Sequence, residues 1–297
     1  MTALFTSTPF DETLSDALNA FPRLERGVEI FWLGQAGFIL RSAEHCLVID
    51  PYLSDSLAEK YRGRTFAHQR MMAAPVEPAE LHSVTHILVT HHHTDHMDGA
   101  TLAPLLHASP GAQLILPRAA RKLAAERIPL SGVEQVTDID AGEKRQLAPG
   151  LTIRAVRASH ETLEQDEAGH YRFLGYVIDM GGVTIFHSGD TVPFAGQVEE
   201  LGTSGIDLAL LPVNGRSATL HAQGVPGNMT PEEGVHLCVE CKIRYMIAHH
   251  YGLFDFNTAD PLALDTMARQ TARPALERAR LQTRYQLEPS LSAENSE

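Results

Sequence analysis

The sequence of 297 residues lacks the long apolar runs of a membrane protein. No stretch approaches the roughly 20 consecutive apolar residues that a membrane-spanning helix needs. The first thirty residues carry Asp11, Glu12, Asp16 and Glu25 and lack the basic start and apolar run of a signal peptide. We therefore expect a cytoplasmic protein without a membrane partner.

Cysteine and positive charge are also scarce. The three cysteines, Cys46, Cys238 and Cys241, are an odd number, which indicates a reducing compartment rather than a disulfide scaffold. Cys238 and Cys241 form a CxxC without a second pair, and we interpret them as inert thiols in a helix.

Asp and Glu exceed Lys and Arg by 37 to 24, a formal net charge of −13, which argues against a nucleic-acid partner.

A low-complexity linker is missing too, and hydrophobic and charged residues make up 43% and 21% of the chain, as in ordinary globular proteins. We therefore expect one domain over residues 1–297. Short β-rich segments alternate with helical ones, which predicts an α/β protein built as a mixed sandwich. The strands are expected at 29–40, 46–49, 84–90, 114–116, 151–158, 176–179, 183–187, 207–213 and 244–248.

Three helices are expected between these strands, at 99–108, 118–127 and 231–241. The last begins with Thr230, Pro231 and Glu233, the pattern of an N-cap, a first-turn proline and a capping box. The C-terminal segment, about 261–288, also has a helical pattern. Within it we expect a kink at Pro274, and after it a frayed tail.

The chain has 16 histidines, and the most informative run is HHHTDH at 91–96. It contains the pattern HxHxDH, which arises by chance in only about one chain in several hundred. The run directly follows an apolar strand and precedes a helix. Alternate residues of an extended backbone point the same way, so His91 and His93 can bind one ion together. The turn into the helix then directs Asp95 and His96 towards a second ion.

Three other apolar strands end at side chains that can bind a metal. These side chains are His160, Asp190 and the pair His249 and His250. In α/β proteins, ligands at successive strand ends gather a site at one edge of the sheet. The sequence therefore predicts a metal site with ligands from four strand ends.

HHHTDH, His160, the HSGDT segment and the HHYGLF segment together resemble the metallo-β-lactamase superfamily, from about residue 29 to residue 261. The resemblance implies an αββα sandwich with the site at one edge of its two sheets. It also implies three ligands for a first metal, three for a second and one bridging carboxylate. The first metal would be bound by His91, His93 and His160. The second would be bound by Asp95, His96 and His250, and Asp190 would be the bridging carboxylate.

Finer features are similar to the branch of this superfamily that contains L-ascorbate-6-phosphate lactonase. These features are Trp32-Leu33-Gly34, the Asp50-Pro51-Tyr52 turn, Asn228-Met229-Thr230 and Ala259-Asp260-Pro261. The resemblance implies a metal-dependent hydrolase that opens a lactone or ester in a small substrate, for which a phosphorylated sugar acid is one candidate. It also suggests a homo-oligomer.

Two ions about 3.5–4 Å apart can share a hydroxide and lower the pKa of its parent water towards neutrality. The expected reaction is therefore attack by this metal-bound hydroxide, with Asp95 and Asp190 as the catalytic carboxylates. No Cys falls in a ligand position, which argues against a soft thiolate site. We expect two divalent ions, Zn²⁺ or Mn²⁺ rather than iron.

Four residues are candidates for substrate contacts. Arg62 and Arg64 follow the Asp-Pro-Tyr turn and could bind an anionic group, as could Arg216. A solvated surface position is an equally good interpretation of these arginines. His249 could contact substrate or be the last metal ligand in place of His250, and a purely structural role is an equally good interpretation. We prefer His250 as the ligand, because it begins the HYG motif.

Two other activities are compatible with these ligands. A phosphodiesterase of the phospholipase-D type, which occurs in the same branch, uses the same two-metal site. A di-iron redox protein is a further alternative on this scaffold. That activity usually requires an appended flavin domain, for which the chain has neither room nor a motif.

Overall fold

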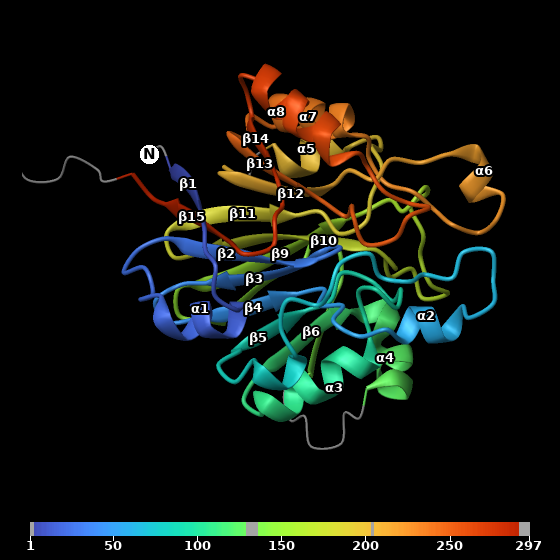
Figure 1. The fold of residues 1–297 in the computed structure, drawn as a ribbon, viewed down its shortest axis with the longest axis horizontal. Helices are drawn as coiled ribbons and strands as arrows, with labels where there is room; N and C mark the ends of the chain where they lie inside the picture. The colour runs from blue at the N-terminus through green and yellow to red at the C-terminus, as the bar shows by residue number, and fades with distance from the viewer. Residues whose placement is uncertain (1–2, 129–135, 203–204, 291–297) are drawn as a thin grey trace, which may run out of the picture.

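Strands that are apolar on both faces form the centre of the molecule (Figure 1). The structure, a computed structural model, describes residues 3–128, 136–202 and 205–290. β2 (Val28–Gly34), β3 (Gly37–Arg41) and β4 (Cys46–Ile49) are buried at every position. Successive side chains of a strand point to opposite faces, so Phe38 packs between the sheets and Ile39 packs under the helices. Burial of both faces explains why these strands are almost continuously hydrophobic.

The strands form two mixed sheets that pack face to face. The first has eight strands, in the order β1 (Leu4–Pro9), β15 (Thr283–Glu288), β2, β3, β4, β5 (His86–Leu88), β6 (Gln113–Pro117) and β7 (Val136–Ile139). The second has seven, in the order β14 (Ala275–Arg278), β13 (Tyr245–His249), β12 (Leu208–Pro212), β11 (Val183–His187), β10 (Leu174–Met180), β9 (Leu151–Arg157) and β8 (Lys144–Ala148).

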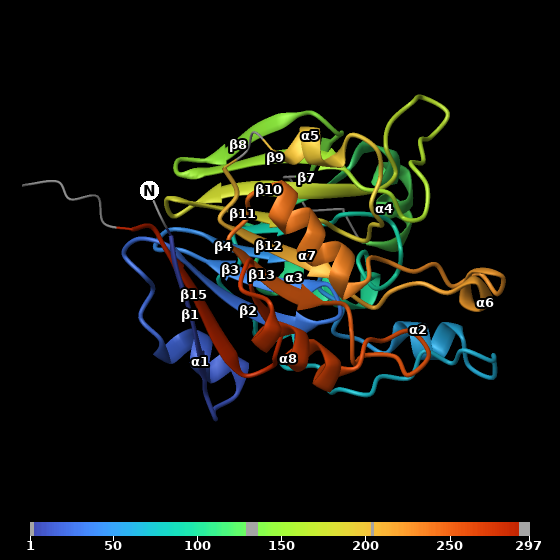
Figure 2. The same cartoon turned by 90° about the horizontal axis from the view of Figure 1, so that it is seen from above.

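Helices cover the outer face of each sheet (Figure 1). The first sheet is covered by α1 (Leu14–Ala20), α3 (Gly99–Ala108) and α4 (Arg121–Arg127), with the 3₁₀ turns Pro78–Glu80 and Arg118–Ala120 beside them. The second is covered by α5 (Gln197–Leu201), α7 (Pro231–Glu240) and α8 (Pro261–Gln270). The short helices α2 (Ser56–Lys60) and α6 (Ala218–His221) project together at one end of the sandwich (Figure 2). The expected αββα sandwich is therefore confirmed.

The capping box expected at the start of α7 is confirmed, because Thr230 and Glu233 exchange side-chain and backbone hydrogen bonds. Cys238 of this helix packs in the core, and burial raises the pKa of Cys241 to about 11, so both thiols are protonated at neutral pH. None of the helices in the described part of the chain has the length and hydropathy needed to cross a bilayer.

The prediction of a helix over 261–288 is wrong beyond Gln270. After α8 the chain forms β14, which pairs in parallel with β13, and β15, which lies between β1 and β2. In β15 the buried residues Thr283, Tyr285 and Leu287 alternate with less buried ones, a period of two that the helical spacing of nearby arginines obscured. Pro274 lies between α8 and β14, so it kinks no helix. The expected frayed tail after 288 falls largely on residues 291–297, outside those that the structure describes.

A buried ion-pair network joins the N-terminal and C-terminal parts of the first sheet. Glu29 of β2 is fully buried, and its carboxylate accepts hydrogen bonds from Arg41 Nε and Arg284 Nε, each at 2.6 Å. Arg41 also donates to the carbonyls of Leu18 and Phe21 at the end of α1. This network therefore positions α1, β3 and β15 around β2.

Replacing Glu29 with Gln should destabilise the protein by about 3–5 kcal/mol, because it leaves the buried guanidinium group of Arg41 and the partly buried one of Arg284 without a counter-charge. Urea unfolding followed by circular dichroism would measure the free energy of unfolding. Glu44→Gln is a matched control, since the Glu44 side chain is 74% exposed and should change stability by no more than about 0.5 kcal/mol. Equal stability of the two variants would show that the network contributes nothing.

Candidate metal centre

The carboxyl ends of four strands meet at one edge of the sandwich. In the second sheet, β9 and β11 are both antiparallel to β10, and β11, β12 and β13 are parallel, so β9, β11 and β13 run in the same direction. In the first sheet, β5 is parallel to β4 and β6. The predicted ligands follow β5, β9, β11 and β13, and the structure brings them together.

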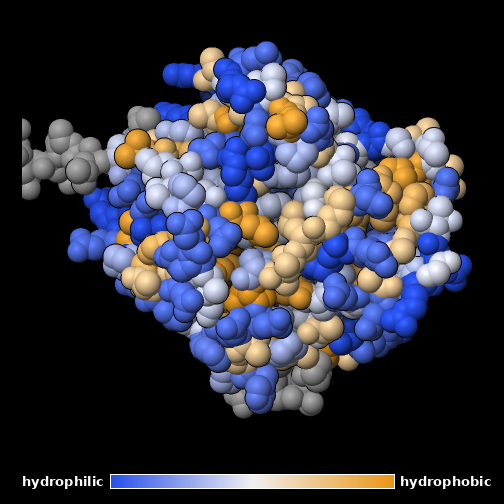
Figure 3. Space-filling view, in the orientation of Figure 1, coloured by the Kyte–Doolittle hydropathy of each residue, from blue (hydrophilic) through white to orange (hydrophobic). Residues whose placement is uncertain are grey.

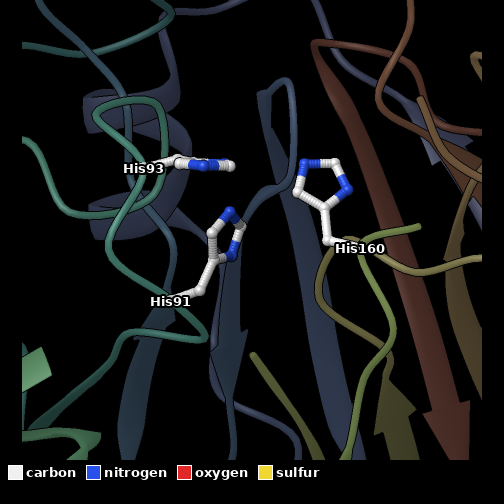
Figure 4. A group of neighbouring side chains, drawn as sticks. All are labelled: His91, His93 and His160. Atoms are coloured by element: carbon white, nitrogen blue, oxygen red, sulfur yellow. The ribbon is translucent and has the colours of Figure 1, made fainter. Parts of the chain in front are cut away.

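The first group of side chains is made of His91, His93 and His160. Their potential ligand atoms all lie within 4.8 Å of one another. His91 and His93 come from the loop after β5 and His160 from the loop after β9, and the three rings turn towards a common point (Figure 4). Three converging imidazoles are a common donor set for a transition-metal ion.

The second group, Asp95, His96 and His250, also has its potential ligand atoms within 4.8 Å of one another. The Asp95 Oδ2 atom lies 3.8 Å from the Nε2 atoms of both His96 and His250. His96 is fully buried, whereas the Asp95 side chain is 17% exposed and lines the cavity described below.

Asp190 lies between the two groups. Its Oδ2 atom is 3.2 Å from His250 Nε2, 3.3 Å from His96 Nε2 and 3.8 Å from His160 Nε2. A carboxylate in this position can contact an ion in either group, which is the placement that a bridging ligand requires. The loop that carries it is tightly packed at Gly189, where a Cβ would lie only 2.5 Å from the carbonyl oxygen of Leu174 in the neighbouring strand β10 and 3.0 Å from Thr90 Cβ in the loop after β5.

The Asp50 carboxylate sets the proton positions on two of the histidines. Its oxygens accept hydrogen bonds from Thr90 N at 2.7 Å, Thr90 Oγ1 at 2.5 Å and His96 Nδ1 at 2.7 Å. Since Thr90 Oγ1 donates its proton to Asp50, it accepts one from His91 Nδ1, 3.0 Å away. Both imidazoles therefore carry their proton on Nδ1 and direct the lone pair of Nε2 into the site.

Unpaired acceptor atoms at the centre indicate that a cation fits this site. His91 Nε2, His96 Nε2 and Asp190 Oδ1 are buried and have no hydrogen-bond partner. A buried acceptor without a donor costs about 1–3 kcal/mol, and three such atoms directed at one point are unfavourable without a positive charge between them. The donor set of imidazole and carboxylate suits Zn²⁺, Mn²⁺ or iron.

Burial keeps the histidines of the first group neutral. It lowers the pKa of His91 and of His93, and it lowers the pKa of His160 to about 4 although the Asp190 carboxylate acts in the opposite direction. Neutral imidazole is the form that binds a metal ion. No proton has to leave these three rings at neutral pH before an ion binds.

The carboxylates make the second group attractive to positive charge. Burial opposes ionisation of Asp190, but the adjacent His250 and His96 rings outweigh it and hold the pKa of this carboxyl well below its usual range. Burial likewise disfavours a charged His96, yet Asp190, Asp50 and Asp95 raise the pKa of this ring well above its usual value. The three carboxylates therefore make the space beside His96 Nε2 favourable for a positive charge.

Backbone strain is concentrated around this site. Gln35, Asp50 and His250 have φ values of 50°, 43° and 63°, in the left-handed region that L-residues avoid. Such residues cost about 1–3 kcal/mol each and persist only where the surrounding structure determines them. The His250 amide donates to the Gln35 carbonyl at 3.0 Å, and Gln35 Nε2 donates to Asp95 at 2.9 Å. These hydrogen bonds therefore hold Gln35 and His250 in their strained conformations and fix Asp95 and His250 of the second group in place.

The two groups open into a cavity of about 700 Å³. Its walls come from the segment around α2, from α4, from the segment after α6 and from the loop after β13. Three cationic residues, Lys60, Arg64 and Arg127, line it together with Asp95 and Asp190. The Arg127 guanidinium also donates to the His92 carbonyl at 2.5 Å, which fixes it next to the HxHxDH loop.

Of the predicted substrate contacts, the structure places only Arg64 in the cavity wall. Arg62 is exposed and is not a lining residue. Arg216 points to the start of α7, where it makes two hydrogen bonds of 2.6 and 2.7 Å to the Glu233 carboxylate. The structure therefore does not bring Arg216 to the cavity wall, and its charge is paired with that of Glu233.

The structure does not bring His249 to the cavity either. Its ring is fully buried, with a centroid 5.1 Å from that of His187 and 5.2 Å from that of Phe38, and it does not line the cavity. His249 is the last residue of β13 and its ring packs in the core, whereas the chain turns into a left-handed conformation at His250, whose ring lies in the second group. Burial lowers the pKa of the His249 ring well below its usual value, which keeps it neutral there.

Sequence reasoning missed Asp50, Thr90, Gln35 and Arg127 as parts of this site. Asp50 directly follows the apolar strand β4, which is the same signal that identified the ligands after β5 and β11. Thr90 and Gln35 act through hydrogen bonds that depend on the neighbouring strand, and no local pattern marks them. Arg127 reaches the site only because α4 packs beside the HxHxDH loop.

Comparison with known proteins identifies related sequences. Residues 45–251 match the family model described as a Beta-lactamase superfamily domain. A UPF0173 metal-dependent hydrolase of Symbiobacterium thermophilum is 30% identical over 251 residues, which cover 82% of this chain and 93% of that protein.

Two solved structures show how widely the fold is shared. An isothiocyanate hydrolase from Delia radicum gut bacteria superposes with a TM-score of 0.67 at 18% identity, covering 84% of this chain and 95% of that one. The di-iron β-hydroxylase CmlA of Streptomyces venezuelae superposes with a TM-score of 0.63 at 14% identity, covering 89% of this chain and 55% of that one. The fold alone therefore does not choose between hydrolysis and redox chemistry.

Replacing Asp50 with Asn should weaken metal binding by about 10–100-fold, because the amide must direct its NH₂ group at a donor on Thr90 or His96. Titration of metal-free protein with Zn²⁺ in the presence of a competing chelator would measure the dissociation constant. Asp207→Asn is the control, since Asp207 also accepts a backbone hydrogen bond, from Thr184 N at 3.0 Å, but lies at the start of β12. Unchanged affinity in folded Asp50→Asn protein would contradict the role assigned to this carboxylate.

Proposed function

The chain belongs to the β-lactamase superfamily and is a metal-dependent hydrolase, and from this premise we propose that it opens a lactone or ester bond of a small anionic substrate at a pair of divalent ions. The observation that carries the proposal is the arrangement of the ligand atoms. Two groups of three side chains, each within 4.8 Å, lie on either side of the Asp190 carboxylate at the base of an open cavity.

The residues that would hold the ions are those of the two groups. His91, His93 and His160 would hold the first ion and Asp95, His96 and His250 the second, with Asp190 contacting both. Ions bound there would lower the pKa of a water molecule towards neutrality and polarise the carbonyl oxygen of the substrate. Zn²⁺ and Mn²⁺ are the proposed ions, because the donor set is imidazole and carboxylate without a thiolate.

Asp95 is the proposed residue for moving a proton during the reaction. Its side chain is 17% exposed, against 5% for Asp190, and it lines the cavity in which a substrate would bind. Gln35 Nε2 donates a hydrogen bond to its Oδ2 atom and holds the carboxylate in one orientation. Asp95 can therefore accept the proton of the attacking water and return it to the leaving oxygen.

The cations of the cavity wall support an anionic substrate. Arg127 is fixed beside the HxHxDH loop by its bond to the His92 carbonyl, and Arg64 and Lys60 line the same cavity from the segment around α2. A phosphate or carboxylate group of the substrate can bind there by charge-assisted hydrogen bonds. A phosphorylated sugar acid is one substrate of this class, and a phosphodiester is the alternative that the panel below distinguishes.

Replacing Asp190 with Asn should reduce the rate of hydrolysis by more than about 100-fold. Loss of a residue that only hydrogen-bonds to a metal ligand already lowers metal affinity or activity by about 10–100-fold, and Asp190 is proposed to be a ligand itself. Metal content would be measured by plasma mass spectrometry and activity on panels of lactones, esters and phosphodiesters. We expect about two equivalents of metal in the wild type, loss of activity on chelation, and activity on lactones or esters rather than phosphodiesters.

Asp179→Asn is the matched control for this experiment. Asp179 is an exposed residue of β10, the strand that pairs with β11 just before Asp190, so its replacement should leave metal content and activity unchanged. Near-normal metal content and turnover in Asp190→Asn would refute the proposed centre. Cleavage of phosphodiesters alone would refute the proposed bond type.

Replacing Arg127 with Gln should raise KM for an anionic substrate by about 10–100-fold. This is the loss of affinity expected when one hydrogen bond between charged groups is removed. KM for a neutral ester of the same size should change little, because the lost contact is made only to the anion. Steady-state kinetics on the two substrates would measure the difference. Arg121→Gln on the exposed side of the same helix is the control, and equal effects of both variants would remove the anion-binding role.

A further inference from the structure

We infer that the substrate carries a flat apolar ring, which packs against an aromatic wall of the cavity beside the candidate metal centre. The aromatic wall consists of Tyr61, Phe66, His68, Phe254 and Phe256, all of which line the cavity. The inference rests on the proposed function in that it names the class of substrate for the same site.

The rings of the aromatic wall form one continuous cluster. The His68 ring stacks on Tyr61 with centroids 4.3 Å apart and an interplanar angle of 21°. The same ring makes edge-to-face contacts with Phe254 and Phe256, with ring centroids 5.0 and 4.8 Å away. Phe66 adds to the far side, with its centroid 4.7 Å from that of Phe256. These distances are those of favourable aromatic pairs.

Backbone contacts hold the two segments of the aromatic wall together. The Met71 amide donates to the Leu253 carbonyl at 2.9 Å and joins the segment after α2 to the loop after β13. His68 Nδ1 donates to the Phe66 carbonyl at 2.7 Å, and burial lowers the pKa of this ring, so it is neutral and presents an aromatic face. The aromatic wall is therefore formed before any ligand arrives.

The aromatic wall is adjacent to the ligands of the second group. Phe254 and Phe256 follow His250 by only four and six residues along the same loop. Phe254 packs on Tyr52 and Leu57 in a small separate core, while Phe66, His68 and Phe256 remain partly exposed to the cavity. A ring placed between these exposed faces would share the cavity with Asp95.

Packing of the fold alone does not account for this cluster. Aromatic residues make up only 6% of the chain: 11 Phe, 1 Trp and 7 Tyr, or 19 in all. Four of these 19 belong to the aromatic wall. Partly exposed rings keep apolar surface in contact with water, which is unfavourable until a ligand covers it.

The opposite side of the cavity is apolar in part as well. Val225 and Pro226, from the segment that follows α6, line the cavity together with the aromatic wall. On the face seen in Figure 3, apolar side chains gather at the end where α6 projects. Lys60 Nζ lies 5.2 Å from the centroid of the Tyr61 ring, so a cation adjoins the apolar surface. A substrate with both a ring and an anionic group would match this combination.

Binding of carboxylate probes to the metal-loaded protein tests the inference without requiring turnover. The probes are phenylacetate, cyclohexylacetate, acetate and gluconate, measured by isothermal titration calorimetry. All four present a carboxylate to the ions and cations, so differences among them report on the rest of the molecule. We expect phenylacetate to bind about 3–10-fold more tightly than cyclohexylacetate, the size of a favourable aromatic contact, and at least about tenfold more tightly than acetate and gluconate, which lack the apolar ring.

Phe66→Ala and Phe256→Ala should each reduce this preference for phenylacetate severalfold and leave the affinity for acetate unchanged. Phe5→Ala is the matched control, because Phe5 is also a partly buried ring packed on two tyrosines, Tyr245 and Tyr285, but lies on β1. Equal affinities for phenylacetate and acetate, tighter binding of cyclohexylacetate or gluconate, or a preference that survives both substitutions would overturn the inference.

Hydrolysis of methyl phenylacetate and methyl acetate separates this inference from the proposed function. We expect the wild type to hydrolyse the aryl ester with a kcat/KM at least about tenfold higher, and Phe256→Ala to lose most of this advantage. If neither these esters nor any lactone is cleaved, the proposed function fails. The binding preference for phenylacetate then still decides whether the aromatic wall recognises a ring.

Discussion

The buried carboxylate of Asp50 is the interaction on which the candidate metal centre depends. It accepts three hydrogen bonds, from the amide and hydroxyl of Thr90 and from the ring of His96. Through Thr90 it also fixes the ring of His91. These bonds join the ends of the parallel strands β4 and β5, so the pairing of two strands determines which nitrogen of each histidine faces the site. Moving either strand would misdirect a ligand of each group at once.

The same arrangement makes the site unfavourable without a positive charge. Buried acceptors on His91, His96 and Asp190 have no donor, and nearby backbone is held in left-handed conformations at Asp50 and His250. Both features cost folding free energy, and a bound cation offsets the first of them. Metal binding and folding are therefore coupled at this edge of the sandwich, since the site is fully formed only in the folded chain.

The ligands and the cavity walls have different origins in the fold. The ligands follow the ends of β5, β9, β11 and β13, whose positions are set by hydrogen-bonded neighbours in the two sheets. The walls come mainly from connections around α2 and α6 and after β13, which bring the aromatic wall and the cations Arg64 and Lys60 into the same cavity. Changes in these connections can alter the substrate without disturbing the metal centre. This separation is consistent with the sharing of the fold by a hydrolase and a di-iron hydroxylase.

The sequence by itself determined the sandwich, most of its strands and the set of candidate ligands, because apolar runs that end in His or Asp are local patterns. It also suggested both His249 and His250 as the last ligand. Only the tertiary structure separated these two, because His249 ends β13 with its ring in the core and the chain turns at His250. The C-terminal strands, the paired charge of Arg216 and the role of Asp50 were likewise decided by partners distant in sequence. Sequence patterns record the chemistry and burial of a residue, whereas the neighbour that it contacts is fixed only when the sheets pack together.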